Sequence, residues 1–262
     1  MAFPLRFGVL RALAKEVSVS GEAGKPLVVG GARELATVLR RELARDATGV
    51  RADDTPDGAA LLVYVLAGEP TPGDEAALKR ARRARVPVVL VATGPVADDV
   101  SLPFVLATDV VRVAPGEGFP LEAIADVVAR RLGEDAAPLA ARVPVLRGAV
   151  ARELVATFAR RNGVTGAAVF VGGADLPVMA LHQARLLLRL EQAYGRSTDL
   201  QERAPELAAT LLAGLGLRAL ARELVALVPG ARWAVQGAVA YAGTRALGEA
   251  VVLRLEAAPG RH

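Results

Sequence analysis

The residues best suited to chemistry are a glycine pair near the N-terminus. Gly30 and Gly31 follow an apolar run, and Thr37 lies seven residues after Gly30. A phosphate loop of the pattern G-x-x-x-x-G-K-[ST] uses glycine amides, a lysine and a hydroxyl at this spacing. Here Leu35 and Ala36 stand where the second glycine and the lysine would be. The pair predicts a structural turn or, as the alternative, an unconventional nucleotide-binding loop.

A second group of candidates lies in the C-terminal half, at polar or packing positions. Asp175 precedes a helical pattern that it could cap, and Tyr194 with Gly195 marks the end of that pattern. His182 and Gln183 lie near its start. Because no serine, aspartate or glutamate constellation accompanies His182, both are predicted to be hydrogen-bonded packing residues rather than a polar pocket. No catalytic residue is assigned.

Composition excludes several classes of function. The 262 residues include no cysteine and only two histidines, so thiolate chemistry, zinc and metal sites are not expected. Aromatic residues make up 4%, which argues against nucleic acid as a partner. Residues 1–144 carry 18 basic and 19 acidic side chains, net −1, whereas residues 145–262 carry 14 and 9, net +5. The positive charge is therefore C-terminal, and the four arginines of Arg80–Arg85 are interpreted as a solvated helix face.

The first 25 residues lack a secretory signal, which favours a cytoplasmic protein. Leu5, Val9, Leu10 and Leu13 are spaced as in a short amphipathic helix over Pro4–Val17.

Residues 26–133 alternate apolar strands with amphipathic helices. Continuous apolar strands separated by helices predict a parallel sheet buried on both faces, an α/β domain. The expected strands are Leu27–Val29, Val50–Ala52 (weak), Ala60–Leu66, Val86–Val91 and Val110–Val113, and the expected helices are Arg33–Arg45, Asp74–Arg85 and Leu121–Leu132.

Residues 134–145 are predicted to be a linker, and residues 146–256 an all-helical bundle. The expected helices are Leu146–Arg161, Val164–Gly173, Pro177–Tyr194, Asp199–Leu215, Leu217–Leu227 and Ala231–Leu255. Ala234, Ala238, Ala242 and Ala246 repeat every four residues, a stripe along which another helix can approach closely. Arginine and glutamate interrupt each long apolar run, which favours a packed bundle, or a hairpin touching a bilayer, over transmembrane spans.

The N-terminal half resembles small Era/Ras-like GTPase domains. Ala59–Leu66 with Pro72–Glu75 is similar to the strand and helix after the second switch, and Val113–Gly118 to the loop that opens the last helix. Thr93 and Gly94 follow the strand that normally ends in the guanine-reading Asn-Lys-x-Asp, and the aspartate is missing. About thirty residues from Gly30 to the next strong strand leave no room for both switches. The resemblance implies a pseudo-GTPase.

The C-terminal half resembles the YcjF-type domain of unknown function, which commonly follows GTPase domains in bacterial proteins. Asp175-Leu176-Pro177, Gln183, Tyr194-Gly195 and Val228-Pro229-Gly230 carry the likeness. The resemblance implies membrane association and supplies no catalytic residues.

Together these patterns predict a non-catalytic pseudo-GTPase adaptor or regulator at the inner face of the membrane. It would have no cofactor, and its partner would be a protein, a second copy or the membrane surface. The first alternative is a GTP or GDP binder with Mg²⁺, or a weak GTPase, that uses Gly30, Gly31, Thr37, Thr93 and Gly94. The second alternative is a helical scaffold that oligomerises through the alanine stripe.

Overall fold

The computed structural model describes residues 24–51, 55–94, 102, 105–168, 176–196 and 232–257. The chain divides into two compact units whose boundary falls between Glu153 and Leu154. We call the described residues before this boundary the sheet unit and those after it the helical unit. Several predicted features lie outside the described residues: the helices Pro4–Val17, Asp199–Leu215 and Leu217–Leu227, and Asp175.

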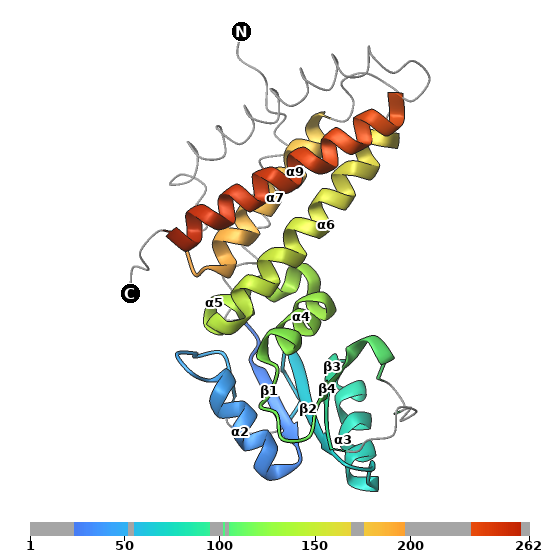
Figure 1. Ribbon diagram of the computed structural model, residues 1–262, viewed down its shortest axis with the longest axis vertical. Helices are drawn as coiled ribbons and strands as arrows, with labels where there is room; N and C mark the ends of the chain where they lie inside the picture. The colour runs from blue at the N-terminus through green and yellow to red at the C-terminus, as the bar shows by residue number, and fades with distance from the viewer. Residues whose placement is uncertain are drawn as a thin grey trace. The chain divides into compact units, whose positions relative to one another are not determined.

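The sheet unit is built on a four-stranded parallel sheet (Figure 1). The strands are β1 (Leu27–Gly31), β2 (Leu61–Ala67), β3 (Val88–Thr93) and β4 (Val110–Val113), in the spatial order β1-β2-β3-β4. Every residue of β2 except the last is buried, as expected of a strand covered on both faces. The predicted parallel sheet is confirmed, and the strands begin or end within two residues of the expected positions.

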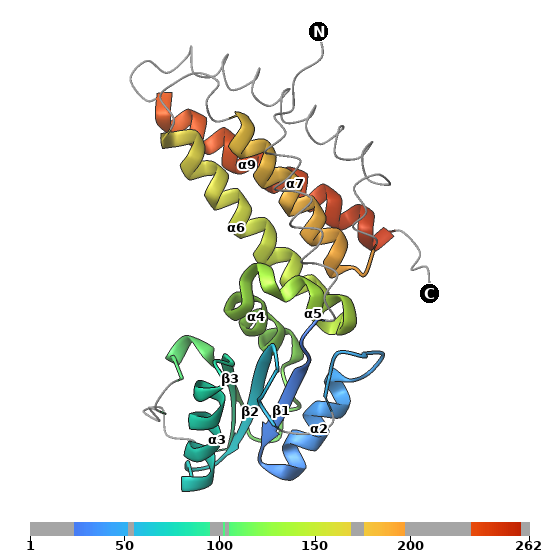
Figure 2. The same cartoon turned by 180° about the vertical axis from the view of Figure 1, so that it is seen from behind.

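Helices cover both faces of the sheet (Figures 1 and 2). On one face, α3 (Pro72–Arg83) packs Leu78 and Ala81 against alternate strand residues such as Leu62, Tyr64 and Leu90. The opposite face lies against α2 (Arg33–Leu43), which contacts β1 and β2, and α4 (Leu121–Leu132), which contacts β3 and β4.

One isolated pairing extends the sheet beyond β1. Leu27 accepts a hydrogen bond from the backbone N–H of Arg51 (2.9 Å) and donates its own to Gly49 (2.8 Å), which makes a parallel bridge to Val50. Ala60, just before β2, donates to Pro26 at the other edge of β1. The weak strand predicted at Val50–Ala52 is thus reduced to one bridged residue among those described, and β1 lies between it and β2.

The predicted linker is instead helical. Residues 133–146 form η2 (Gly133–Ala136), α5 (Ala137–Arg142) and η3 (Pro144–Leu146). Leu139 and Val143 are fully buried. The guanidinium of Arg142 donates to the carbonyl oxygen of Lys25 at 2.7 Å, and the carbonyl oxygen of Arg142 accepts from the N–H of Thr48 at 3.0 Å. Alanine and proline are common in linkers, but here the alanines pack in the core and the prolines lie in the first turns of short helices.

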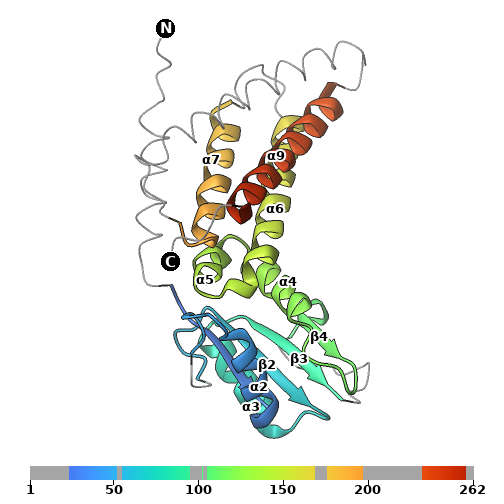
Figure 3. The ribbon, with the colours of Figure 1, turned by 60° about the vertical axis from the view of Figure 1, so that its left-hand side comes forward.

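The helical unit contains the greater part of α6 (Arg147–Ala168), together with α7 (Leu176–Ala193) and α9 (Arg232–Ala257), side by side in Figure 3. Two helices were expected where α6 is continuous. Gly163 does not end the helix, because it lies in a close contact with α9: a Cβ there would be 3.2 Å from Tyr241 Cβ.

Glycine, not alanine, brings α6 and α9 together. A Cβ on Gly237 would lie 3.0 Å from Ala167 Cβ, and one on Gly248 would lie 2.6 Å from a methyl group of Val155. The predicted alanine stripe does not face α6, since Ala238, Ala242 and Ala246 are exposed. The expectation that the stripe makes the close helix packing is therefore wrong for the described helices.

Candidate functional site

The carboxyl ends of the parallel strands form the edge at which open α/β sheets bind ligands. Gly30 and Gly31 end β1, and Thr93 ends β3 and is followed by Gly94. The structure therefore places these four predicted residues at the same edge, with β2 between the two pairs. A ligand there would need open space and donor groups between the strand ends.

Gly31 closes the gap between β1 and β2. Its φ is +104°, and a Cβ at this position would lie 2.0 Å from the carbonyl oxygen of Val65. The next amide, the N–H of Ala32, donates to the same oxygen at 2.9 Å. Only glycine can be accommodated here, and the reason is contact between two backbones. The Ala32 amide is therefore bonded within the sheet.

The other elements of a phosphate loop are also engaged in structure. Thr37 donates its hydroxyl to the carbonyl oxygen of Arg33 at 2.7 Å, one helical turn earlier. Ala36, at the position of the missing lysine, is 2% exposed and packs inside the unit. Glu34 adds a negative charge to the first turn of α2. None of these side chains offers a positive charge or a free hydroxyl to an anion.

Thr93 joins the ends of β2 and β3. Its hydroxyl donates to the carbonyl oxygen of Leu66 at 3.2 Å, and its own carbonyl oxygen accepts from the N–H of Gly68, also at 3.2 Å. Gly94 has a φ of +83° with open space around its Cα. Thr93 thus links the ends of β2 and β3 by hydrogen bonds, whereas Gly94 is exposed.

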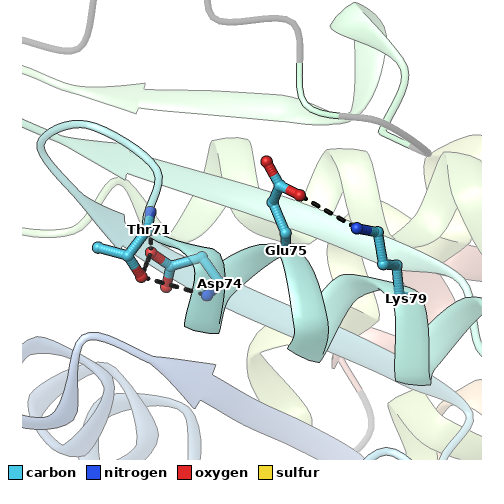
Figure 4. A network of polar contacts seen from close by, with 4 residues as sticks. All are labelled: Thr71, Asp74, Glu75 and Lys79. Carbon is cyan, nitrogen blue, oxygen red and sulfur yellow. Dashed lines mark hydrogen bonds and ion pairs between the residues drawn. The ribbon is translucent and has the colours of Figure 1, made fainter.

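The start of α3 is a polar centre that the sequence analysis missed (Figure 4). Asp74 accepts hydrogen bonds from the N–H (2.8 Å) and hydroxyl (2.6 Å) of Thr71 and from the hydroxyl of Tyr64 (2.6 Å). The Thr-Pro-Gly-Asp sequence is the local signal, because Thr71 and Asp74 form a capping box with proline in the first turn. Tyr64 comes from β2 and could not be assigned from local sequence.

These contacts hold Asp74 as a carboxylate. Partial burial by itself raises the pKa of Asp74, but the hydrogen bonds from Thr71 and Tyr64 outweigh it, and the pKa lies below its ordinary value. A carboxylate whose oxygens are occupied in this way is a poor general base. Glu75 and Lys79, on the next turns, form an exposed ion pair at 3.1 Å (Figure 4).

The ligand edge as a whole is acidic. The described stretches that follow the strands are residues 32–35, 68–75, 94 and 114–118, and within them Arg33 is the one basic residue. The same stretches contain the carboxylates Glu34, Glu69, Asp74, Glu75 and Glu117. This distribution disfavours a polyphosphate, whose binding relies on positive charge and amides.

In the helical unit, His182 belongs to a buried polar layer with Asn162 and Thr244. The amide Nδ2 of Asn162 donates to the hydroxyl of Thr244 at 2.9 Å. Its Oδ1 lies 2.8 Å from Nδ1 of His182, so the imidazole donates. The layer joins α6, α7 and α9, and it gives His182 a hydrogen-bonded position between helices. The hydrogen bond between Asn162 and Thr244 could not be predicted from the sequence, because 82 residues separate the two.

The remaining predicted residues of α7 are structural as well. Gln183 is buried, and Tyr194 donates its hydroxyl to Glu256 on α9 at 3.0 Å. Gly195 ends the helix with a φ of +71°, as predicted, and its N–H donates to the carbonyl oxygen of Gln192. The fully buried Glu191 forms an ion pair with Arg254 of α9.

Two further features are absent from the part of the chain that the structure describes. No group of three or more histidine, aspartate or glutamate side chains is close enough to hold a metal ion within that part of the chain. No helix among the same residues is long and apolar enough to cross a membrane. Comparisons with family models, curated proteins and solved structures give no match to the chain.

Proposed function

We propose that this protein is a non-catalytic pseudo-GTPase that acts as an adaptor or regulator, with a helical unit that associates with a membrane surface. The observation that carries the non-catalytic part is the closure of the first strand–helix turn. Gly31 packs against Val65, and the N–H of Ala32 is bonded to the same residue. A phosphate could use the Ala32 amide only if this pairing broke.

Charge supports the same conclusion. The place of the phosphate-binding lysine is taken by the buried Ala36, and carboxylates outnumber cations along the ligand edge. A parallel sheet that lacks the phosphate-binding lysine but keeps its strand order is suited to present surfaces to a protein partner. Surfaces available for this purpose include the exposed arginines Arg80, Arg82 and Arg83 of α3, together with Arg85 just after this helix.

Thermal unfolding with and without Mg²⁺ and each guanine and adenine nucleotide tests the proposal. A ligand at 100 times its Kd would stabilise the folded state by about 2.7 kcal/mol. For a chain of this size that would raise the midpoint by several degrees, at roughly 2–4 °C per kcal/mol. We expect no shift with any nucleotide. A nucleotide-specific rise would instead establish a binder and direct mutations to Gly30 and Thr37.

Membrane association is tested separately by flotation with anionic vesicles. Its support is the net charge of +5 in residues 145–262 and the apolar side chains on the helical unit, including Trp233 at 58% exposed. We expect the protein to float with vesicles containing phosphatidylglycerol. Complete recovery in the lipid-free fraction would remove this part of the proposal without affecting the nucleotide result.

A second candidate function, an oligomeric scaffold, is favoured by the exposure of Ala238, Ala242 and Ala246 on α9. Such a smooth face could lie against the same face of a second copy. Ala238→Leu would then dissociate the oligomer. A light-scattering mass equal to one chain for the unmodified protein would exclude this function.

A further inference from the structure

The buried polar layer of Asn162, His182 and Thr244 divides the helical unit into two parts of different character. We call the part that contains residues 163–168 of α6, 176–181 of α7 and 233–243 of α9 the tip. These segments lie at one end of the unit (Figures 1 and 3). Contacts define the same end: a Cβ on Gly166 would lie 2.9 Å from Ala240 Cβ, and one on Gly237 would lie 3.0 Å from Ala167 Cβ.

The tip contains no aspartate, glutamate, lysine or arginine. The charge-free part of α9, residues 233–244, is 12 residues long and spans about 18 Å at about 1.5 Å per residue. On the other side of the polar layer all three helices carry charges, among them Arg160, Glu191 and Glu256. Charged and uncharged residues are therefore separated along the length of the helical unit, on all three helices, and not between two faces of one helix.

Large apolar side chains are exposed at this tip. Val164 on α6 is 69% exposed, Val178 on α7 is 43% exposed, and Trp233 on α9 is 58% exposed. They come from three different helices, each on a stretch of the tip that carries no charged residue. In contrast, a small-residue and polar interior holds the helices together through Gly163, Gly237 and the polar layer. Apolar side chains outside and small or polar ones inside are typical of helices that contact lipid.

Basic residues adjoin the tip from its charged side. Within five residues of the polar layer, in 157–161, 183–187 and 245–249, there are four arginines and one glutamate, a net charge of +3. The arginines are Arg160, Arg161, Arg185 and Arg245, of which Arg185 alone is partly buried. Glu249 is paired with Arg245 at 2.8 Å. We call these four arginines the collar. A positive collar behind an apolar tip complements anionic lipid headgroups.

We propose that the helical unit meets an anionic lipid bilayer tip first, with Val164, Val178 and Trp233 entering one leaflet and the collar facing its headgroups. The proposal rests on the membrane association proposed above and names its surface. Because α9 begins at Arg232, immediately before Trp233, the contact is confined to the membrane interface, where amphipathic helices bury their apolar face by roughly 5–10 Å.

The chain carries its own probe, because Trp233 is its one tryptophan. Vesicles of phosphatidylglycerol with phosphatidylcholine should shift the emission of Trp233 to shorter wavelength. Lipids brominated near the headgroup should quench it more than lipids brominated near the chain end. Vesicles of phosphatidylcholine alone, or high salt, should reduce both effects, because the attraction of the collar is screened.

Matched variants locate the contact. Val164→Glu with Val178→Glu should weaken partition roughly tenfold or more, since about 1.4 kcal/mol corresponds to a factor of ten. Leu253→Glu is the control, because Leu253 is 67% exposed on the charged half of α9. Arg160→Gln with Arg161→Gln should lower the preference for anionic vesicles, whereas Arg80→Gln with Arg83→Gln, on exposed residues of α3, should not. Circular dichroism confirms that each variant is folded.

Each outcome decides between the proposals. Flotation with an unchanged Trp233 spectrum, or equal losses in Val164→Glu and Leu253→Glu, would overturn the tip contact and leave membrane association intact. Failure to float with any vesicle would overturn both. A shift of Trp233 emission that depends on protein concentration without lipid, together with a doubled light-scattering mass, would show that the tip covers a second copy and would also overturn the lipid contact.

Discussion

Asn162 on α6 and Thr244 on α9 are 82 residues apart in sequence and are joined by a buried hydrogen bond of 2.9 Å. The same amide accepts from His182 on α7. One fully buried side chain thus fixes the relative register of three helices. A buried polar group in this position is specific because every alternative packing would leave it without partners.

Replacing Asn162 should therefore destabilise the helical unit. Asn162→Leu leaves the Thr244 hydroxyl and the His182 imidazole without this partner, and we expect a loss of about 1–3 kcal/mol of unfolding free energy. Thr244→Ser keeps the hydroxyl and is the matched control, with a smaller loss. Urea unfolding followed by circular dichroism measures both. Equal losses in the two variants would contradict a role for the hydrogen bond.

Gly31→Ala should be among the most damaging small substitutions in the sheet unit. The new Cβ would clash with the carbonyl oxygen of Val65. The alanine would also have to adopt the positive φ that Gly31 has. Together these effects should cost at least about 3 kcal/mol. Gly58→Ala is the control, since Gly58 has a φ of +72° but open space around it, and should cost about 1–2 kcal/mol. Similar urea midpoints for the two variants would refute the closure of β1 on β2.

The pKa of Asp74 gives a stability difference that depends on pH. Because its folded-state pKa lies below the ordinary value, the stabilisation is present above about pH 4, the unfolded pKa. It is lost as the pH falls through the folded pKa. Asp74→Asn should therefore be less stable than the unmodified protein at pH 7, and the difference should shrink at lower pH. Unfolding measured from pH 7 to pH 2 tests this; a constant difference would exclude it.

Tyr64→Phe separates the tyrosine from the rest of the Asp74 centre. It removes the 2.6 Å hydrogen bond to Asp74 while the capping box with Thr71 remains. We expect a loss of roughly 0.5–1.5 kcal/mol, rising toward 3 if the charged acceptor is poorly hydrated. Nuclear magnetic resonance titration should show a higher pKa for Asp74 in this variant. An unchanged titration would mean that Thr71 alone holds the carboxylate.

The ion pair of Glu191 and Arg254 should respond unequally to loss of each partner. Glu191 is fully buried, whereas the Arg254 side chain is 44% exposed. Arg254→Ala leaves a buried carboxylate with a weaker partner in Arg196, so it should destabilise more than Glu191→Gln, which removes the buried charge. A double-mutant cycle gives the coupling. Greater damage from Glu191→Gln would contradict this account.

The sheet was predictable because local sequence carried the signal. Leu61–Leu66 is a continuous apolar run, and a run buried on both faces can belong only to an interior strand or a buried helix. The ends of α2, α3 and α4 were predicted within two residues for the same reason. The start of α3 could have been refined from Thr71 and Asp74, whose spacing is that of a capping box.

The helical unit was harder to predict because distant residues decide its packing. Glycine at position 163 suggested a break, yet it continues α6 because the helix approaches α9 there. The alanines of α9 suggested the contact face, but the glycines of that helix make it instead. The partners of His182 lie on other helices, so its role could be named only in general terms. Hydropathy patterns specify which residues are apolar and not which helix they meet.

The contact between α6 and α9 has a consequence for synthesis of the chain. Gly163 and Gly237 pack together across more than seventy residues of sequence, so α6 has no partner for its glycine face until α9 has left the ribosome. The sheet unit ends before this point, and all its strands are made first. We therefore expect folding during translation to proceed in two separate stages, because domains generally fold as units from the N-terminus. The helical unit, with its exposed apolar residues, is completed last.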